Sequence, residues 1–261
     1  MRALKIAATG MQAQQMRVEV ISNNLANMST TAYNPRRAEF SDLQYEQIQR
    51  AGAVNASDGT VLPAGVQLGL GVRPSAISMD VSQGSLRQTG GDLDVAIDGN
   101  GYLEVTLPSG QPAYTRDGAL KRTGDGLIVT SDGYPVAPDI TIPNDARAIS
   151  INAEGEVYAY FDGQVAPTQI GQFDLVSFTN QKGLEAIGGN LYLETEASGA
   201  ADAGTAGIDG RGTFRQGFLE DSAVDPVREI THLIEAQRGY ELNAKVITAA
   251  DQMLSATTQI R

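Results

Sequence analysis

A single histidine, His232, is the only residue of the chain that could act as the base of a Ser-His-Asp triad. Such a base must lie in a cleft beside a nucleophile, whereas His232 stands next to Leu233 within an apolar helical repeat. We therefore interpret His232 as a packing residue of a helix–helix interface. Cysteine is absent, so the chain has no thiolate nucleophile, no disulfide and no cysteine-type zinc site, and one histidine cannot build a histidine-rich metal site.

The other candidate ligand motifs do not match their templates. Residues 98–101 (DGNG) are similar to part of a calcium loop, but an EF-hand in that register needs carboxylates where the chain has Ala96 and Leu107. Gly69 and Gly71 are not followed by the third glycine of a dinucleotide fingerprint, and no phosphate-loop lysine motif occurs. We predict no cofactor, no metal site and no catalytic residue.

Acidic side chains are abundant enough in the middle of the chain to supply a pair for glycoside cleavage. Residues 51–210 contain twenty carboxylates, so any chosen pair is weak support for an acid/base mechanism, and a solvated acidic face explains them better. The chain is therefore predicted not to be an enzyme. A glycan-acting or glycan-binding β domain stays as a remote alternative.

Charge is unevenly distributed along the 261 residues. The net charge of the chain is −12. Residues 51–210 have a charge of −13, whereas residues 1–50 have +2 and residues 211–261 have −1. Such a balance argues against nucleic acid or an anionic membrane as a partner, because both repel a polyanion. No apolar stretch reaches the ~18 residues of a membrane helix, and glutamines interrupt the N-terminal segment, so we expect no membrane insertion and no cleavable signal peptide.

The N-terminal segment has the pattern of a long helix over residues 2–27. Leu4, Met11, Val18 and Leu25 fall seven residues apart, and Ala7, Ile21 and Met28 fill positions three further on. This spacing predicts an a/d stripe that is interrupted by the polar Gln14.

The C-terminal segment predicts a second helix that continues to the end of the sequence. Asp225 is a candidate N-cap and is followed by Pro226 at the first helical position. Two apolar lines follow: Leu233, Tyr240, Ile247 and Leu254, and beside them Val246, Met253 and Ile260.

These two helices are too long to lie wholly on their own globule. At 1.5 Å per residue they would run roughly 40 and 50 Å, whereas a small domain is ~30 Å wide. We therefore expect the helices to pair with each other and to leave one apolar line for a neighbouring copy. Three asparagines near the end of the first helix are expected to hydrogen-bond across that contact and fix its register. The predicted subunit-interface residues are Leu4, Met11, Val18, Ile21, Asn23, Asn24, Leu25, Asn27, Leu233, Tyr240, Val246, Ile247, Met253, Leu254 and Ile260.

Between the helices the pattern changes to short apolar runs separated by Asp-Gly turns, which is typical of antiparallel β structure. Residues 93–97 and 102–105 are predicted to pair as a hairpin across the 98–101 turn, and 198–207 are predicted to be a flexible loop. The fold class is therefore α+β: a mainly-β centre with terminal helices that pair as a coiled-coil-like stem. The predicted divisions are a stem (1–35 and 222–261), an extended or hairpin segment (36–80) and a central β region (81–221), which is divisible into a connecting part (81–110 with 190–221) and an outer part (111–189).

Six stretches of the chain resemble motifs of the flagellar basal-body rod and hook family, in the same order along the sequence. They are 22–27 (SNNLAN) with 31–33 (TAY), 83–90 (QGSLRQTG), 93–102 (LDVAIDGNGY), 114–118 (YTRDG), 216–225 (QGFLEDSAVD) and 235–241 (EAQRGYE). The segment 45–74, including LPAGVQLGLGVRP at 62–74, is most similar to the distal rod members. Two positions depart from the family pattern: Ala32 replaces a usual glycine and Asn34 a usual lysine.

The resemblance implies a structural subunit that polymerises into an open-ended, helical, hollow rod and carries torque from motor to hook. It implies terminal helices in an inner tube and β domains projecting outward. It further implies a rod that spans the periplasm, export by the flagellar type III apparatus, axial contacts with proximal rod and hook proteins, and outer ring proteins around the rod. Another axial member of the family, such as a proximal rod or hook protein, is the alternative.

Overall fold

The computed structural model describes residues 2–50, 64–163 and 166–259. The chain divides into two compact units. One, which we call the helix–ribbon unit, consists of Met1–Ala26, Arg36–Met79 and Asp225–Arg261. The other, which we call the β unit, consists of Asn27–Pro35 and Asp80–Val224.

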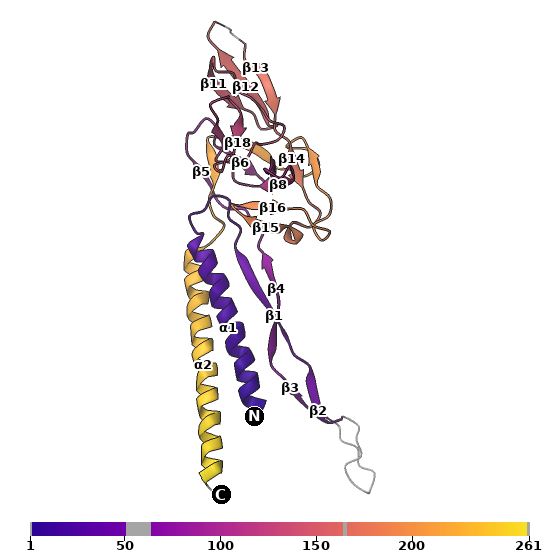
Figure 1. Ribbon diagram of the computed structural model, residues 1–261, viewed down its shortest axis with the longest axis vertical. Helices are drawn as coiled ribbons and strands as arrows, with labels where there is room; N and C mark the ends of the chain where they lie inside the picture. Colours follow the sequence, from indigo (N-terminus) through magenta and orange to yellow (C-terminus); the bar gives the residue numbers. More distant parts are fainter. Residues whose placement is uncertain (1, 51–63, 164–165, 260–261) are drawn as a thin grey trace. The chain divides into compact units, whose positions relative to one another are not determined.

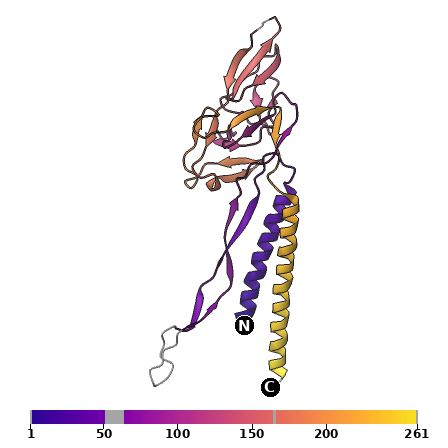
Figure 2. The same ribbon diagram turned by 180° about the vertical axis from the view of Figure 1, so that it is seen from behind.

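Two long helices of the helix–ribbon unit lie side by side and run antiparallel (Figure 1, Figure 2). They are α1 (Arg2–Ala26) and α2 (Pro226–Gln259). Asp225 caps α2, because its Oδ1 accepts hydrogen bonds from the backbone N–H groups of Val227 at 3.0 Å and Arg228 at 3.2 Å. Both predicted helices are therefore confirmed, with the predicted N-cap in place.

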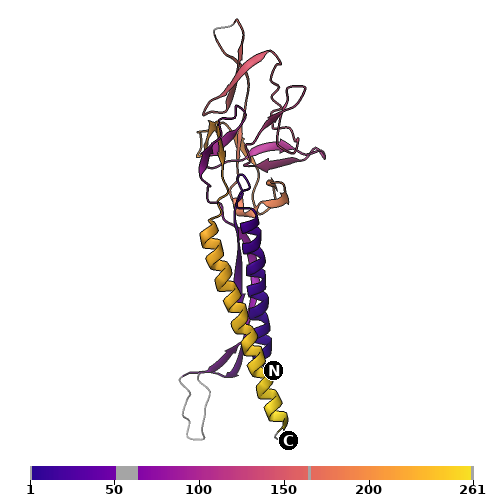
Figure 3. The same cartoon turned by 90° about the vertical axis from the view of Figure 1, so that its left-hand side faces the viewer.

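A β ribbon completes the helix–ribbon unit. β1 (Arg36–Asp42) pairs antiparallel with β4 (Val72–Met79), and β2 (Tyr45–Gln49) pairs with β3 (Val66–Gly69). β1 and β4 contact α1, where the Thr9 hydroxyl accepts a hydrogen bond from the backbone N–H of Val72 at 3.3 Å. Figure 3 shows the paired strands alongside α1.

The β unit is built from short antiparallel strands. A four-stranded sheet has the order β15-β16-β8-β7, a three-stranded sheet has the order β11-β12-β13, and β6–β18, β5–β19, β9–β10 and β14–β17 form pairs. The bounds are β5 (Leu86–Gln88), β6 (Val95–Asp98), β7 (Leu103–Thr106), β8 (Pro112–Thr115), β9 (Lys121–Arg122), β10 (Ile128–Val129), β11 (Ala146–Ile151), β12 (Glu156–Phe161), β13 (Thr168–Gln172), β14 (Leu175–Ser177), the 3-10 helix η1 (Gln181–Gly183), β15 (Glu185–Gly188), β16 (Leu191–Leu193), β17 (Asp202–Gly204), β18 (Thr213–Gln216) and β19 (Phe218–Glu220). The mainly-β centre that the sequence predicts is confirmed.

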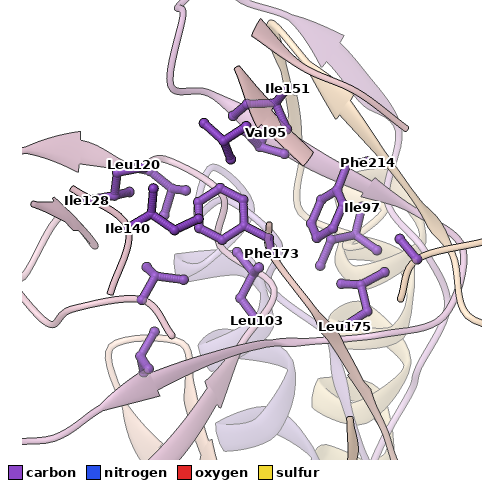
Figure 4. Packing of buried hydrophobic residues seen from close by; sticks show 14 of the residues in the cluster. Val95, Ile97, Leu103, Leu120, Ile128, Ile140, Ile151, Phe173, Leu175 and Phe214 are labelled. Carbon is purple, nitrogen blue, oxygen red and sulfur yellow. The ribbon is translucent and has the colours of Figure 1, made fainter. Parts of the chain in front are cut away.

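The core of the β unit is aliphatic with two central rings. Phe173 is fully buried, and its ring centroid lies 6.2 Å from that of Phe214. Figure 4 shows Leu103 and Ile140 beside the Phe173 ring and Ile97 beside Phe214. Because tryptophan is absent, many small apolar side chains from distant strands share the packing.

The predicted hairpin over 93–105 is wrong. β6 pairs with β18, and β7 pairs with β8. Gly99 and Gly101 have φ angles of +114° and +145°, which do not match the two-residue turns that close tight hairpins. The turn instead separates two buried strands, each of which takes a different partner.

The predicted flexible loop over 198–207 is wrong in part. Residues 202–204 form β17, which pairs with β14. The Ser198 side chain is fully buried, and its hydroxyl accepts a hydrogen bond from the backbone N–H of Thr195 at 2.9 Å. Small residues permit close backbone packing in this stretch. A composition rich in Ala and Gly is equally typical of a solvated loop, so the sequence alone did not predict the strand.

The turn after α1 contains both departures from the family pattern. Ala32 is buried with φ +52°, a left-handed conformation in which a Cβ is unfavourable and glycine is favoured. Its backbone N–H donates to the carbonyl of Glu220 at 2.8 Å. Asn34 is also buried.

Candidate subunit interface

The surface at which α1 meets α2 is a row of facing positions that we call the seam. Near the start of α2, Asn24 Nδ2 donates to Glu229 Oε2 at 3.2 Å. Further along, Arg17 Nη2 lies 3.4 Å from Glu235 Oε2, in a solvent-exposed ion pair. Such a pair stabilises weakly, because water and salt screen it. These contacts fix the antiparallel register of the two helices.

Small residues leave room for side chains of the facing helix in the rest of the seam. A Cβ on Gly10 would come within 3.0 Å of the Asn243 amide, and a Cβ on Gly239 within 3.1 Å of Gln14. The Gln14 Oε1 atom is buried without a hydrogen-bond partner in the described part of the chain. Further buried small residues of the two helices are Ala7, Ala13, Ala236 and Ala250. Among the described residues, the seam therefore consists of small and polar groups, with Ile21 as its one large buried apolar residue.

The predicted stripe of α1 lies partly beside the seam. Ala7 and Ile21 are buried within the chain. Leu4, Met11, Val18 and Leu25 are half-buried. Gly10, Arg17 and Asn24 each precede one of these residues, so the predicted line is rotated by about 100° from the seam.

The first predicted line of α2 is rotated from the seam in the same sense. Leu233, Tyr240 and Ile247 each follow a seam position (Glu229, Ala236 and Asn243) by four residues, a rotation of about 40°. Because the helices are antiparallel, both rotations point to the same side of the helix pair. We call this side the flank face; it consists of Leu4, Met11, Val18, Leu25, Leu233, Tyr240, Ile247 and Leu254.

The described residues of the second predicted line of α2 are exposed. Val246 and Met253 are exposed, and so are Tyr240 and Leu254 from the first line, while Leu233 and Ile247 are half-buried. Ile260 lies outside the described residues. The helix pair thus leaves much of the predicted apolar surface uncovered within one chain.

The three predicted register residues have different environments. Asn24 is 1 % exposed, and its amide donates to the Arg36 carbonyl at 2.8 Å and accepts from the Arg36 N–H at 2.9 Å. Asn27 Oδ1 accepts a hydrogen bond from the Thr30 hydroxyl at 3.2 Å within the turn of the β unit. The Asn23 side chain is exposed. Of the three, Asn24 joins α1, α2 and β1.

A further apolar set on α2 was missed by the sequence analysis. Val227, Ile230, Ile234 and Leu242 are all exposed, together with Val246. Val227, Ile230 and Ile234 lie on the side of α2 opposite the seam, and Leu242 and Val246 lie between that side and the seam, away from the flank face. We call these five residues the outer strip. The spacing of residues 227, 230 and 234 follows helical periodicity, so the sequence could have predicted this set. Only residues at heptad spacing were assigned to apolar lines.

The ribbon carries exposed apolar residues of its own. Among the described residues of β1–β4 and their turns, Tyr45, Ile48, Val66, Leu68, Leu70 and Ile77 are exposed. A two-stranded ribbon is marginally stable alone in water, so exposed apolar side chains on it indicate a surface that gains stability when another surface covers it.

Among the described residues there is neither a cluster of metal-ligating side chains nor a helix suited to cross a membrane. They contain no cluster of three or more His, Asp or Glu side chains that could hold a metal ion. Neither described helix has the length and apolar character needed to cross a bilayer. His232 Nδ1 lies 3.8 Å from Glu229 Oε1 near the first turn of α2.

The large pKa shifts belong to the core of the β unit. Burial raises the pKa of Tyr102 to about 12, against the opposing effect of the Arg116 charge. Burial also raises the pKa of Tyr114 to about 12, with help from Glu104 and Glu194. Both groups stay protonated at neutral pH, so they offer no base for catalysis.

Three protein-family descriptions match separate stretches of the chain. "Flagella basal body rod protein" matches residues 4–33, "Flagellar hook protein FlgE/F/G D1 domain" matches 96–159, and "Flagellar basal body rod FlgEFG protein C-terminal" matches 215–260. The first and last coincide with the two helices and their flanking turns, and the middle one lies in the β unit.

Full-length relatives are similar along the whole chain. The flagellar basal-body rod protein FlgG of Caulobacter vibrioides is 52 % identical over 261 residues, covering 100 % of both chains. FlgG of Agrobacterium fabrum is 46 % identical over 99 % of both chains. The flagellar hook-basal body complex protein FlhP of Bacillus subtilis is 32 % identical over 100 % of both chains.

Proposed function

The chain belongs to the flagellar basal-body rod family as a structural subunit of the distal rod, and we propose that it builds this rod by polymerising through its helix–ribbon unit. The polymer is an open-ended helical tube, because a head-to-tail contact that does not close generates a filament. Its task is mechanical: it carries torque from the motor to the hook.

The placement of exposed apolar surface carries this proposal. Of the nineteen large apolar side chains described as exposed, fourteen belong to the helix–ribbon unit. Soluble monomers rarely expose large apolar patches unless these are interaction sites. The flank face and the outer strip occupy different sides of α2, so one copy offers two surfaces, as a polymer requires.

The finer form of the helix pair is part of the proposal. We assign α1 and α2 to a coiled-coil-like stem, with Asn24 fixing its register as a buried polar residue does in coiled coils. The seam of small residues supports close pairing. Neighbouring copies would then supply the large apolar contacts that the seam lacks.

The predicted division of the chain is retained in the proposal. Residues 1–35 and 222–261 form the stem, 36–80 form a ribbon that adds to the polymer contacts, and 81–221 project outward. The projecting region 81–221 has two parts. The connecting part consists of 81–110 and 190–221, and the outer part consists of 111–189. The acidic centre suits a surface that faces water or ring proteins around the rod.

The subunit contacts are assigned to the predicted residues and the outer strip. The predicted set is Leu4, Met11, Val18, Ile21, Asn23, Asn24, Leu25, Asn27, Leu233, Tyr240, Val246, Ile247, Met253, Leu254 and Ile260. Proximal rod and hook proteins are proposed as axial neighbours, and the flagellar export apparatus as the route of delivery.

Complementation tests the assignment. The chain is expressed in a flagellated species whose own distal rod gene has been deleted, and basal bodies are isolated and imaged by electron microscopy. We expect restored rods in which the chain occupies the distal part. Incorporation only at the proximal rod or in the hook would replace the assignment with another axial role.

A further inference from the structure

Three segments of the β unit lead to the helix–ribbon unit, and Glu220, the last residue of β19, lies in one of them and contacts the other two. The segments are 27–35, which joins the helix–ribbon unit at both ends, and 80–85 and 220–224, which each join it at one end, so the chain crosses between the units four times. We call them the connecting segments. The Glu220 carbonyl accepts the N–H of Ala32 at 2.8 Å, and Glu220 Oε1 accepts the N–H of Gly84 at 3.0 Å. One buried residue therefore joins all three segments.

Arg116 anchors this residue to the core of the β unit. Its Nε and Nη2 atoms donate to Glu220 Oε2 at 3.1 and 2.9 Å. Its Nη1 atom donates to the carbonyls of Gly99 and Gly101, each at 3.0 Å. The two side chains are only 7 % and 2 % exposed. The ion pair is therefore dry and well supplied with hydrogen bonds.

Backbone contacts join the connecting segments around the same point. The Ala223 N–H donates to the Tyr33 carbonyl at 3.0 Å, and the Asp80 N–H to the Pro35 carbonyl at 2.8 Å. A Cβ on Gly84 would collide with the Asp221 carbonyl, so only glycine permits this approach. The three segments are thus held edge to edge.

A buried ion pair is poorly suited to raising stability, because desolvation offsets most of its attraction. Its best-attested use is to select one register over others. Here the groups that the pair orders are the connecting segments themselves. Three of the stretches that resemble family motifs, at 83–90, 114–118 and 216–225, meet in this one contact.

We propose that Arg116 and Glu220 form a clamp that locks the three connecting segments in one register, so that all four chain crossings are restrained together. Both are positioning residues. The mechanical consequence rests on the proposed function: in a rod under torque, segments restrained together resist slipping past one another, whereas separate linkers would twist independently.

Amide hydrogen exchange on the full-length monomer tests the clamp. The variants are Arg116→Lys, which keeps a charge but loses the two-pronged contact, and the double variant Arg116→Met/Glu220→Met, which removes both charges. We expect the amides of Ala32, Gly84 and Ala223 to exchange about tenfold faster or more, while core amides such as those of Tyr102 and Val176 change by less than about threefold.

Arg211→Met is the matched control. Arg211 is the second arginine with a buried head group; it pairs with Asp202 at 2.6 Å and Asp209 at 3.4 Å. We expect this variant to leave the exchange of the connecting segments unchanged.

Two results would overturn the clamp: equal acceleration of core and connecting amides, or unchanged exchange at the connecting segments in both variants. If the double variant does not fold, Arg116→Lys alone decides. The readout uses monomer, so it is independent of polymerisation. A wild-type chain that never forms rods would remove the proposed function and leave the clamp standing.

Discussion

Asn24 shows how one buried polar side chain can define a junction. Its amide is almost fully buried and bonds both backbone groups of Arg36 as well as the Glu229 carboxylate. The end of α1, the start of β1 and the first turns of α2 therefore depend on one residue. An apolar side chain of similar size would leave all of these groups without their partner.

Replacing Asn24 with leucine is expected to lower the free energy of unfolding of the helix–ribbon unit by about 2–3 kcal/mol, because buried polar groups lose their hydrogen bonds. Urea unfolding followed by helix circular dichroism measures the loss. Gln15→Ala is the control on the same helix, where the lost hydrogen bond to Glu19 is exposed. A loss equal to that of the control would show that Asn24 does not hold the junction.

Tyr102 is expected to destabilise the β unit slightly at neutral pH and more at alkaline pH. Its hydroxyl is buried without a hydrogen-bond partner in the described residues, so Tyr102→Phe should raise the free energy of unfolding by about 1 kcal/mol at neutral pH. The raised pKa of about 12 means that the unfolded chain loses this proton first as pH rises above ~10.

Stability should therefore fall between about pH 10 and pH 12, because the folded state binds more protons there than the unfolded state. Tyr102→Phe should reduce the slope of this fall, as measured by unfolding at several alkaline pH values. A slope identical to that of the wild type would contradict the burial argument.

Residue-level prediction from the sequence was good for local chemistry and poor for distant partners. The Asp225 cap depends on its immediate neighbours and was predicted. The asparagine cluster was recognised, but the bonds of Asn24 to Arg36 depend on a turn whose path was unknown. The left-handed Ala32 was flagged only through its departure from the family pattern, since alanine gives no local signal for such a conformation.

At the scale of elements, the seam differs from a leucine-rich heptad contact. Large apolar residues at heptad spacing placed the line of Leu4, Met11, Val18 and Leu25 in α1 one position away from the seam, whereas Ala7 and Ile21 of the same stripe lie in it. The contact uses Gly10 and Gly239, which leave room for the Asn243 and Gln14 side chains of the facing helix, and buried alanines. Periodicity found both helices because amphipathic spacing is local, but the facing surface depends on shape.

Substitutions at Gly239 test the close approach. Gly239→Ala is expected to change stability by less than about 1 kcal/mol, because the gain in helix propensity offsets a small shift of the Gln14 tip. Gly239→Leu should push the helices apart and lower the thermal midpoint of the helix signal by several degrees. Equal midpoints for the two variants would show that the seam is loose at this point.

The strands of the β unit were less predictable than the helices. Alternating short runs and Asp-Gly turns were sufficient to predict β structure, but not the pairing of β6 with β18, which are more than one hundred residues apart. Such partners are chosen by burial on both sides of the strand, which a local pattern does not contain.

For the whole molecule, charge and apolar surface are separated. The acidic excess lies in residues 51–210, whereas most of the described exposed apolar side chains lie in the helix–ribbon unit. Repulsion between acidic regions favours their exposure to water, and burial of apolar faces favours association through the helices. A polymer satisfies both requirements at once.

The most direct measurement is electron microscopy of the purified full-length chain over a range of concentrations, with Ile234→Asp beside it. Ile234 belongs to the outer strip, and burying a carboxylate there would be costly. Ile208→Asp is the control, since Ile208 is an exposed apolar residue of the β unit. We predict hollow rods from the wild type and from Ile208→Asp, and folded monomers only from Ile234→Asp. Rods of normal length from Ile234→Asp, or monomers from the wild type at every concentration, would contradict assembly through the exposed helical surface.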